Sequence, residues 1–175
     1  MYQNQNMVAT IDYSSLIREQ SSLVERGIHR VNFFIRIKLP FFLILSFANW
    51  TIKKMNNRLS MQLLLSKGAL ANLKEDFENL KGQDLSPLIT DLNELNILNI
   101  DFNTHIEKAL NEGLGNYIKG ITNTKNLLEE TIEVQYDLIR LLKKANKIVP
   151  MQTSDVAKSI SAHSFDNMQK VNYGR

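Results

Sequence analysis

The acidic residues Glu129, Glu133 and Asp137 are the side chains whose spacing comes closest to a catalytic arrangement. They are four residues apart, which places three carboxylates along one line of a helix. Neighbouring carboxylates can perform general acid–base chemistry when burial separates their pKa values. Nothing in the surrounding residues indicates a cleft, so the pattern favours a solvated helix face.

Histidine is the second residue type that could do chemistry. His29, His105 and His163 lie far apart, and none belongs to a His-x-x-x-His or Glu-x-x-His pair of the kind that holds a metal on one helix face. Asp101 and His105 are four residues apart, a spacing typical of a surface contact. The sequence therefore predicts no metal site and no cofactor.

Other catalytic motifs are missing from the sequence. The chain has no Cys, which excludes disulfides, thiolate metal sites and cysteine nucleophiles. It has no phosphate-binding glycine loop, and no serine stands in a Gly-x-Ser-x-Gly turn. We therefore expect a protein that is not an enzyme.

Positive charge gathers in the first third of the chain. Residues 1–60 hold eight basic and three acidic side chains, whereas residues 61–150 hold ten basic and thirteen acidic ones. This asymmetry predicts an anionic partner for the front of the chain, either phospholipid or nucleic acid, unless the two halves neutralise each other on folding. The predicted anionic contacts are Arg26, Arg30, Arg36, Lys38, Lys53, Lys54 and Arg58.

The most apolar segment is Pro40–Trp50, which reads PFFLILSFANW. The uncharged run around it, Leu39–Ile52, has 14 residues, short of the ~20 that a spanning helix needs. It also starts too late for a signal peptide, and no small-residue cleavage site follows it. The interpretations that remain open are a buried core helix, an interfacial or membrane-inserting element and, against the length rule, a true span. The predicted membrane or partner contacts are Phe41, Phe42, Leu43, Leu45, Phe47 and Trp50.

The elements that must position these residues are helices. Residues 1–11 are polar and aperiodic, which predicts a flexible arm. An apolar stripe then predicts a helix from Ser15 to about Lys38, and Pro40 predicts a break after it. Residues 12–50 thus form a basic and apolar front segment.

Residues 51–150 carry a heptad pattern that predicts a long helical hairpin. Gly82 predicts the end of one arm, and Ser86, as a capping hydroxyl before Pro87, predicts the start of the next. Because a short turn joins the arms, they should pair in antiparallel fashion. The predicted seam residues are Leu59, Leu63, Leu70, Leu73, Phe77, Leu80, Leu88, Leu92, Leu95, Phe102 and Ile106, with Asn99 as a polar member.

Glycines at 113, 115 and 120 interrupt the second arm and predict a hinge, a tight crossing or a loop. The apolar pattern resumes at Ile121 with a broad face suited to packing among several helices, and Pro150 predicts its end. Residues 151–175 offer only short signals and predict a loosely ordered tail.

These patterns predict an all-α fold, an elongated helical bundle with a long antiparallel coiled-coil-like hairpin. One helical domain should cover residues 12–150. The predicted function is a non-catalytic interaction or assembly subunit that forms homo-oligomers or binds a helical partner, attached to a membrane surface through its front segment. The alternatives are a membrane-inserting or pore-forming protein and an accessory subunit that contacts a nucleic-acid backbone. A cytoplasmic or membrane-peripheral location is expected.

Overall fold

The computed structural model describes residues 3–37 and 42–147, and within them the side chains of 14–37 and 44–147. These residues form four long helices, α1 (Gln3–Ile37), α2 (Phe42–Glu75), α4 (Ser86–Asn111) and α5 (Ile121–Asn146). The short helices α3 (Phe77–Leu80) and η1 (Leu114–Asn116) lie in the connections. The described part of the chain contains no strand, and the predicted all-α helical bundle is confirmed.

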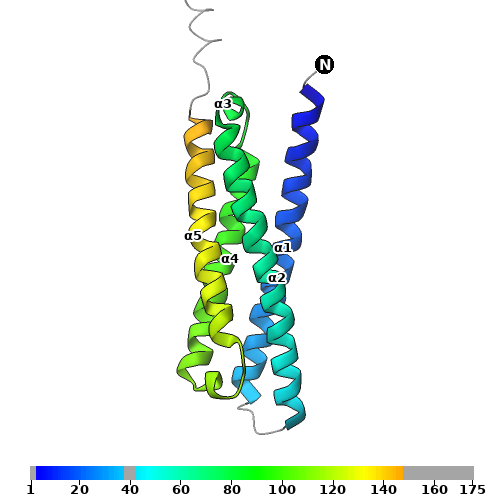
Figure 1. Cartoon of the computed structure of the whole chain (residues 1–175), viewed down its shortest axis with the longest axis vertical. Helices are drawn as coiled ribbons and strands as arrows, with labels where there is room; N and C mark the ends of the chain where they lie inside the picture. The colour runs from blue at the N-terminus through cyan, green and yellow to red at the C-terminus, as the bar shows by residue number, and fades with distance from the viewer. Residues whose placement is uncertain (1–2, 38–41, 148–175) are drawn as a thin grey trace, which may run out of the picture.

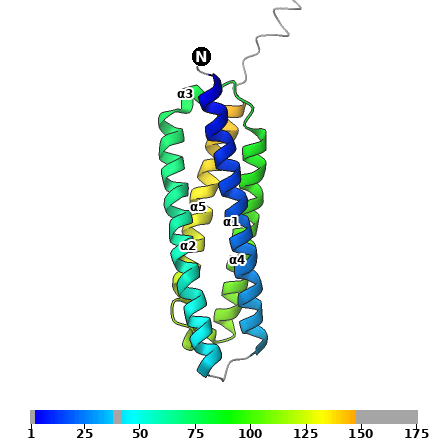
Figure 2. The ribbon, with the colours of Figure 1, turned by 90° about the vertical axis from the view of Figure 1, so that its right-hand side faces the viewer.

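The long helices lie side by side and alternate in direction along the chain (Figure 1). α1 packs on α4, α4 on α5 and α5 on α2, whereas α1 and α2 meet at few points. Two of the extensive contacts, α1 with α4 and α2 with α5, therefore join helices that run in the same direction. The side of the bundle between α1 and α2 is the loosely closed one (Figure 2).

Each long helix turns an apolar stripe towards the bundle axis, and burial of these side chains is what holds the helices together. The buried residues include Ile17, Val24, Val31 and Phe34 of α1, Ala48, Ile52 and Leu59 of α2, Leu92, Leu95 and Phe102 of α4, and Ile121, Leu128, Leu138 and Leu142 of α5.

Gly27 allows α1 to approach its neighbours closely. A Cβ atom there would lie 2.8 Å from Cζ of Phe102 on α4 and 2.9 Å from Sδ of Met55 on α2. The missing side chain thus makes room for the Phe102 ring between α1 and α2.

The coiled-coil detail of the hairpin is not confirmed. α2 and α4 follow each other in sequence, but their extensive contacts are with α5 and α1 rather than with each other. Most seam residues face the shared core, because a third helix offers each arm a broader apolar face than the other arm does. Leu59, Leu63, Leu80, Leu88, Leu92, Leu95, Phe102 and Ile106 are buried, and Leu70, Leu73 and Phe77 are half-buried.

The predicted turn between α2 and α4 is confirmed with one correction. Gly82 has a φ of 84°, and Pro87 lies in the first turn of α4. Ser86 is the first residue of α4 rather than its cap, and Leu85 stands at the capping position without a side-chain cap bond. The carboxylate of Asp84 accepts the Ser86 backbone N–H at 3.1 Å. Hydrogen bonds from the side chain and the backbone of Ser86 lower the pKa of Asp84.

The glycine-rich segment after α4 is a loop. Gly113 and Gly120 both have positive φ, 84° and 85°, at the two ends of the segment that contains η1. L-residues with a side chain rarely adopt this conformation. The predicted long hairpin therefore consists of three helices, with α5 returning along α2.

In the front segment, α1 begins earlier than the sequence predicts, whereas the break between α1 and α2 lies where it was predicted. α1 begins at Gln3, ahead of the predicted start at Ser15, because no Pro or Gly interrupts the chain before Gly27. α1 ends at Ile37 and α2 begins at Phe42, on either side of the predicted break. Pro40 itself, Pro150 and the tail 151–175 lie outside the described residues.

Candidate functional site

The acidic residues that could have done chemistry lie on the exposed face of α5. Glu129 accepts a hydrogen bond from Nζ of Lys125 at 2.7 Å, and this bond raises the pKa of Lys125. Asp137 lies 3.5 Å from Nη1 of Arg140, and Glu133 is also exposed. These carboxylates form a solvated face, as the sequence indicates.

Asp101 and His105 form a local contact on α4. Nδ1 of His105 lies 2.8 Å from the Asp101 carbonyl oxygen and 3.5 Å from its carboxylate. The described residues hold no group of three or more His, Cys, Asp or Glu side chains that could bind a metal ion.

A row of aromatic rings crosses from α1 to α2 near the connection between these helices. The ring centroids of Phe33 and Phe34 are 5.9 Å apart, those of Phe34 and Phe47 are 6.2 Å apart, and those of Phe47 and Trp50 are 6.1 Å apart. Phe34 is buried, but Phe33 is 50%, Phe47 48% and Trp50 56% exposed. We call Phe33, Phe34, Phe47 and Trp50 the aromatic row.

The aromatic row is anchored at its buried ring and open at the other three. Edge-on and stacked ring pairs of this kind stabilise one another by about 0.5–1.5 kcal/mol beyond the area they bury. Nζ of Lys54 lies 5.1 Å from the centroid of the Trp50 ring, so a cation covers the outermost aromatic side chain. The row presents apolar surface to solvent with a positive charge at its rim.

The predicted membrane contacts fall partly within the described residues. Phe41 lies outside them, as do the side chains of Phe42 and Leu43. Leu45 is half-buried, while Phe47 and Trp50 are exposed. Ala48 lies between Phe47 and Trp50 in the sequence and Ile52 follows them, and both Ala48 and Ile52 are buried. The described part of this segment is therefore amphipathic rather than buried on all sides.

Two asparagines of α2 hold the loop after α4 at this same end of the bundle. Oδ1 of Asn49 accepts the Lys119 backbone N–H at 2.6 Å. Nδ2 of Asn56 donates to the Gly120 carbonyl at 2.9 Å, and Oδ1 of Asn56 accepts from the Thr124 hydroxyl at 2.7 Å. The loop contributes a further exposed aromatic residue, Tyr117, which is 58% exposed.

The predicted anionic contacts are exposed wherever they are described. Arg26, Arg30 and Arg36 lie on α1 and Lys53, Lys54 and Arg58 on α2, whereas Lys38 lies outside the described residues. Within the described part of the chain, none of these six forms an ion pair with a carboxylate. Among the described residues, no carboxylate therefore neutralises their charge.

A groove of about 520 Å³ lies between α1 and α2, on the loosely closed side of the bundle. Its base includes Val24, Gly27, Met55, Leu59 and Phe102. Its walls combine cations, apolar residues, one carboxylate and two amides, namely Leu16, Glu19, Gln20, Leu23, Arg26 and Arg30 of α1 and Lys54, Arg58, Met61, Gln62 and Leu65 of α2. We call this feature the α1–α2 groove.

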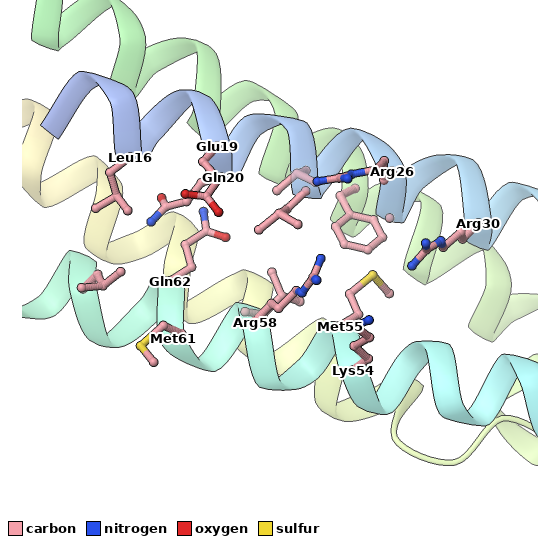
Figure 3. A pocket seen from close by; sticks show the side chains of 16 residues that line it. Leu16, Glu19, Gln20, Arg26, Arg30, Lys54, Met55, Arg58, Met61 and Gln62 are labelled. Carbon is pink, nitrogen blue, oxygen red and sulfur yellow. The ribbon is translucent and has the colours of Figure 1, made fainter. Parts of the chain in front are cut away.

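Positive charge gathers at one end of the α1–α2 groove. Figure 3 shows Arg26, Arg30, Lys54 and Arg58 towards one end and Leu16 and Met61 towards the other. Gln62 reaches from α2 towards Glu19 and Gln20, and its buried Nε2 has no hydrogen-bond partner among the described atoms.

Sequence reasoning identified the four cations of the groove but missed its other walls. Gln20 and Gln62 are 8% and 5% exposed, which is unusual for glutamine. Gln20 stands three residues after Ile17 and four before Val24, so its place in the apolar stripe was a usable signal. No feature of the sequence indicated that α1 and α2 lie beside each other at this register.

No helix of the described residues combines the length and the apolar character that crossing a bilayer would require. Comparison with known proteins gives no match to a family model, to a curated protein or to a solved structure. The function of this chain therefore has to be argued from the aromatic row, the unpaired cations and the α1–α2 groove.

Proposed function

We propose that this protein is a non-catalytic helical bundle that attaches to anionic membrane surfaces through the end where α1 meets α2, and acts there as an assembly subunit. The observation that carries the proposal is the aromatic row, with three rings about half exposed. Aromatic side chains that are apolar on one side and wet on the other favour the membrane interface.

The cations around the aromatic row support the choice of an anionic surface. Arg36 stands three residues after Phe33, Lys54 covers Trp50, and Lys53 is exposed beside it. Basic side chains near an anionic membrane contribute about 1 kcal/mol each, and this contribution is screened by salt. Attachment would combine apolar contact with charge, and no helix would need to cross the bilayer.

Trp50 is the only tryptophan of the chain, so its fluorescence reports on the proposed contact directly. We expect vesicles of anionic phospholipid to shift its emission to the blue, and neutral vesicles to do so less. Dye release from the same vesicles tests the pore-forming alternative. Steeply salt-dependent binding to duplex nucleic acid, without any vesicle binding, would favour the nucleic-acid alternative instead.

Matched variants separate the aromatic row from apolar surface elsewhere. Phe47→Ser should weaken vesicle binding about five- to tenfold. The exposed half of the ring can be buried in the membrane interface, and this burial contributes roughly 1 kcal/mol to the free energy of binding. Ile97→Ser is the control, because Ile97 is 64% exposed on α4. Equal binding by both variants, or equal loss in both, would contradict attachment through the aromatic row.

Self-association through α2 is the form of assembly that we propose. Met61 and Leu64 on α2 are 57% and 65% exposed. Neighbouring apolar side chains that are exposed in this way form a patch that a second protein surface can cover. Leu64→Glu should lower the mass measured by sedimentation if the wild-type protein forms oligomers. A monomeric wild-type chain would exclude this second role and leave membrane attachment untouched.

A further inference from the structure

We propose that the α1–α2 groove binds a single-chain anionic amphiphile of the fatty-acid class, with its carboxylate at the Arg26, Arg30, Lys54 and Arg58 end and its hydrocarbon chain directed towards Leu16 and Leu65. This site contains none of the four rings of the aromatic row but shares Lys54 with its rim, and it does not depend on membrane attachment.

The size of the groove favours a slender occupant. Its volume of about 520 Å³ lies in the range of small-molecule sites. Lys54 to Leu65 on α2 cover about 17 Å at 1.5 Å per residue, so the groove is elongated along the two helices. An elongated groove with cations at one end suits a single hydrocarbon chain that carries one anionic head.

The distribution of charge sets the direction of the ligand. Four cations line one end, and the described carboxylates form no ion pair with any of them. Arg26 and Arg58 present guanidinium groups, which suit the planar geometry of a carboxylate. Glu19 stands in the other part of the groove, where its charge would repel an anionic head (Figure 3).

The base of the groove suits an acyl chain. Val24 and Leu59 are 2% and 4% exposed, and the Phe102 ring closes the groove from below where Gly27 leaves room for it. Leu16, Leu23 and Leu65 supply apolar contacts away from the cations, beside the polar side chains of Glu19, Gln20 and Gln62. A chain lying here would bury hydrocarbon that is otherwise in contact with water.

The test is calorimetric titration of the full chain with dodecanoate below its micelle concentration. Dodecyltrimethylammonium has the same chain and the opposite head charge, so it is the matched ligand. We expect one dodecanoate per chain and at least about tenfold weaker binding of the cationic amphiphile, because four like charges would face its head. Equal binding of the two amphiphiles would overturn the proposal.

Paired charge reversals locate the site. Arg30→Glu combined with Lys54→Glu should weaken dodecanoate binding about tenfold or more. Arg18→Glu combined with Lys53→Glu is the control, because both residues are exposed on the same two helices, outside the groove, and the change in net charge is equal. Equal losses in the two double variants would mean that only overall charge matters, and would refute the groove as the site.

Two further measurements separate this site from its competitors. Trp50→Ser should keep the wild-type affinity for dodecanoate, and a loss in that variant alone would move the binding to the aromatic row. Sedimentation with and without dodecanoate should give the same mass. Two results together would overturn the proposal: a wild-type dimer that dissociates as dodecanoate is added, and no dimer in the Arg30→Glu/Lys54→Glu variant. They would identify a second copy of the chain as the occupant of the groove.

Discussion

Asn99 and Gln135 form an amide pair in the middle of the bundle, and we predict that the two residues are energetically coupled. Both are fully buried, and Nδ2 of Asn99 donates to Oε1 of Gln135 at 3.0 Å. Oδ1 of Asn99 and Nε2 of Gln135 have no further partner among the described atoms. The pair thus satisfies only part of its hydrogen-bonding capacity, and loss of either residue leaves the other amide buried with no partner.

The perturbation is a double-mutant cycle with Asn99→Ala and Gln135→Met. Each single change should lower the free energy of unfolding by about 1–3 kcal/mol, because the remaining amide loses its partner in a dry interior. The double variant removes both members of the pair and leaves neither amide without its partner, so it should lose less than the sum of the two single losses. The expected coupling energy is about 1–2 kcal/mol.

Urea denaturation followed by circular dichroism measures these free energies, with an unchanged slope showing that the unfolding transition is the same in each variant. Each kcal/mol should also move the thermal midpoint by about 3 °C. Asn126→Ala, on the exposed face of α5, is the control and should change the unfolding free energy by less than about 0.5 kcal/mol. Additive losses would refute the reasoning, since they would show that the hydrogen bond carries no coupling.

Three further predictions concern close packing, the loop and pH. Gly27→Ala should destabilise the bundle by about 1–3 kcal/mol in urea denaturation, because the new Cβ would lie 2.8 Å from the Phe102 ring. Gly68→Ala is the matched change on α2, where a new Cβ would meet nothing within 4 Å, and it should stabilise the protein by up to about 1 kcal/mol. Asn56→Ala should cost about 1–2 kcal/mol and speed hydrogen exchange at 117–120, because it removes the bonds to Gly120 and Thr124. The pKa of Asp84 is lowered in the folded chain, so its stabilising contribution should be present above its usual pKa of 3.8 and be lost as pH falls through the lowered value. Thermal midpoints of wild type and Asp84→Asn should accordingly converge at acidic pH, and a constant difference would contradict this assignment.

Local features of the sequence predicted the elements well, because their causes act over a few residues. The apolar stripe of α1, the restart at Pro87 and the glycines around η1 all mark helices or their ends, and the structure places them there. The start of α1 was predicted too late, since a polar segment without Gly or Pro can continue a helix that its apolar pattern does not reach. The exposed state of the predicted cations also followed from their residue type.

Helix pairing could not be predicted in the same way. The heptads of α2 and α4 predicted arms that pack on each other, but α5 has a broad apolar face and takes the extensive contact with both. A heptad seam indicates that a helix face is buried, but it does not indicate which helix covers that face. The walls of the α1–α2 groove were missed for this reason, since Arg30 and Lys54 stand on helices that the sequence did not place together.

The sequence by itself determined that this protein is all-α, which of its heptad seam residues turn inward and that its positive charge lies at the front, because these properties depend on periodicity and residue type. Only the tertiary structure decided which side of the bundle is loosely closed and where the charge and the exposed rings meet. Those properties depend on the register between helices, which the combined packing of several side chains fixes, with Gly27 and Phe102 at the closest approach.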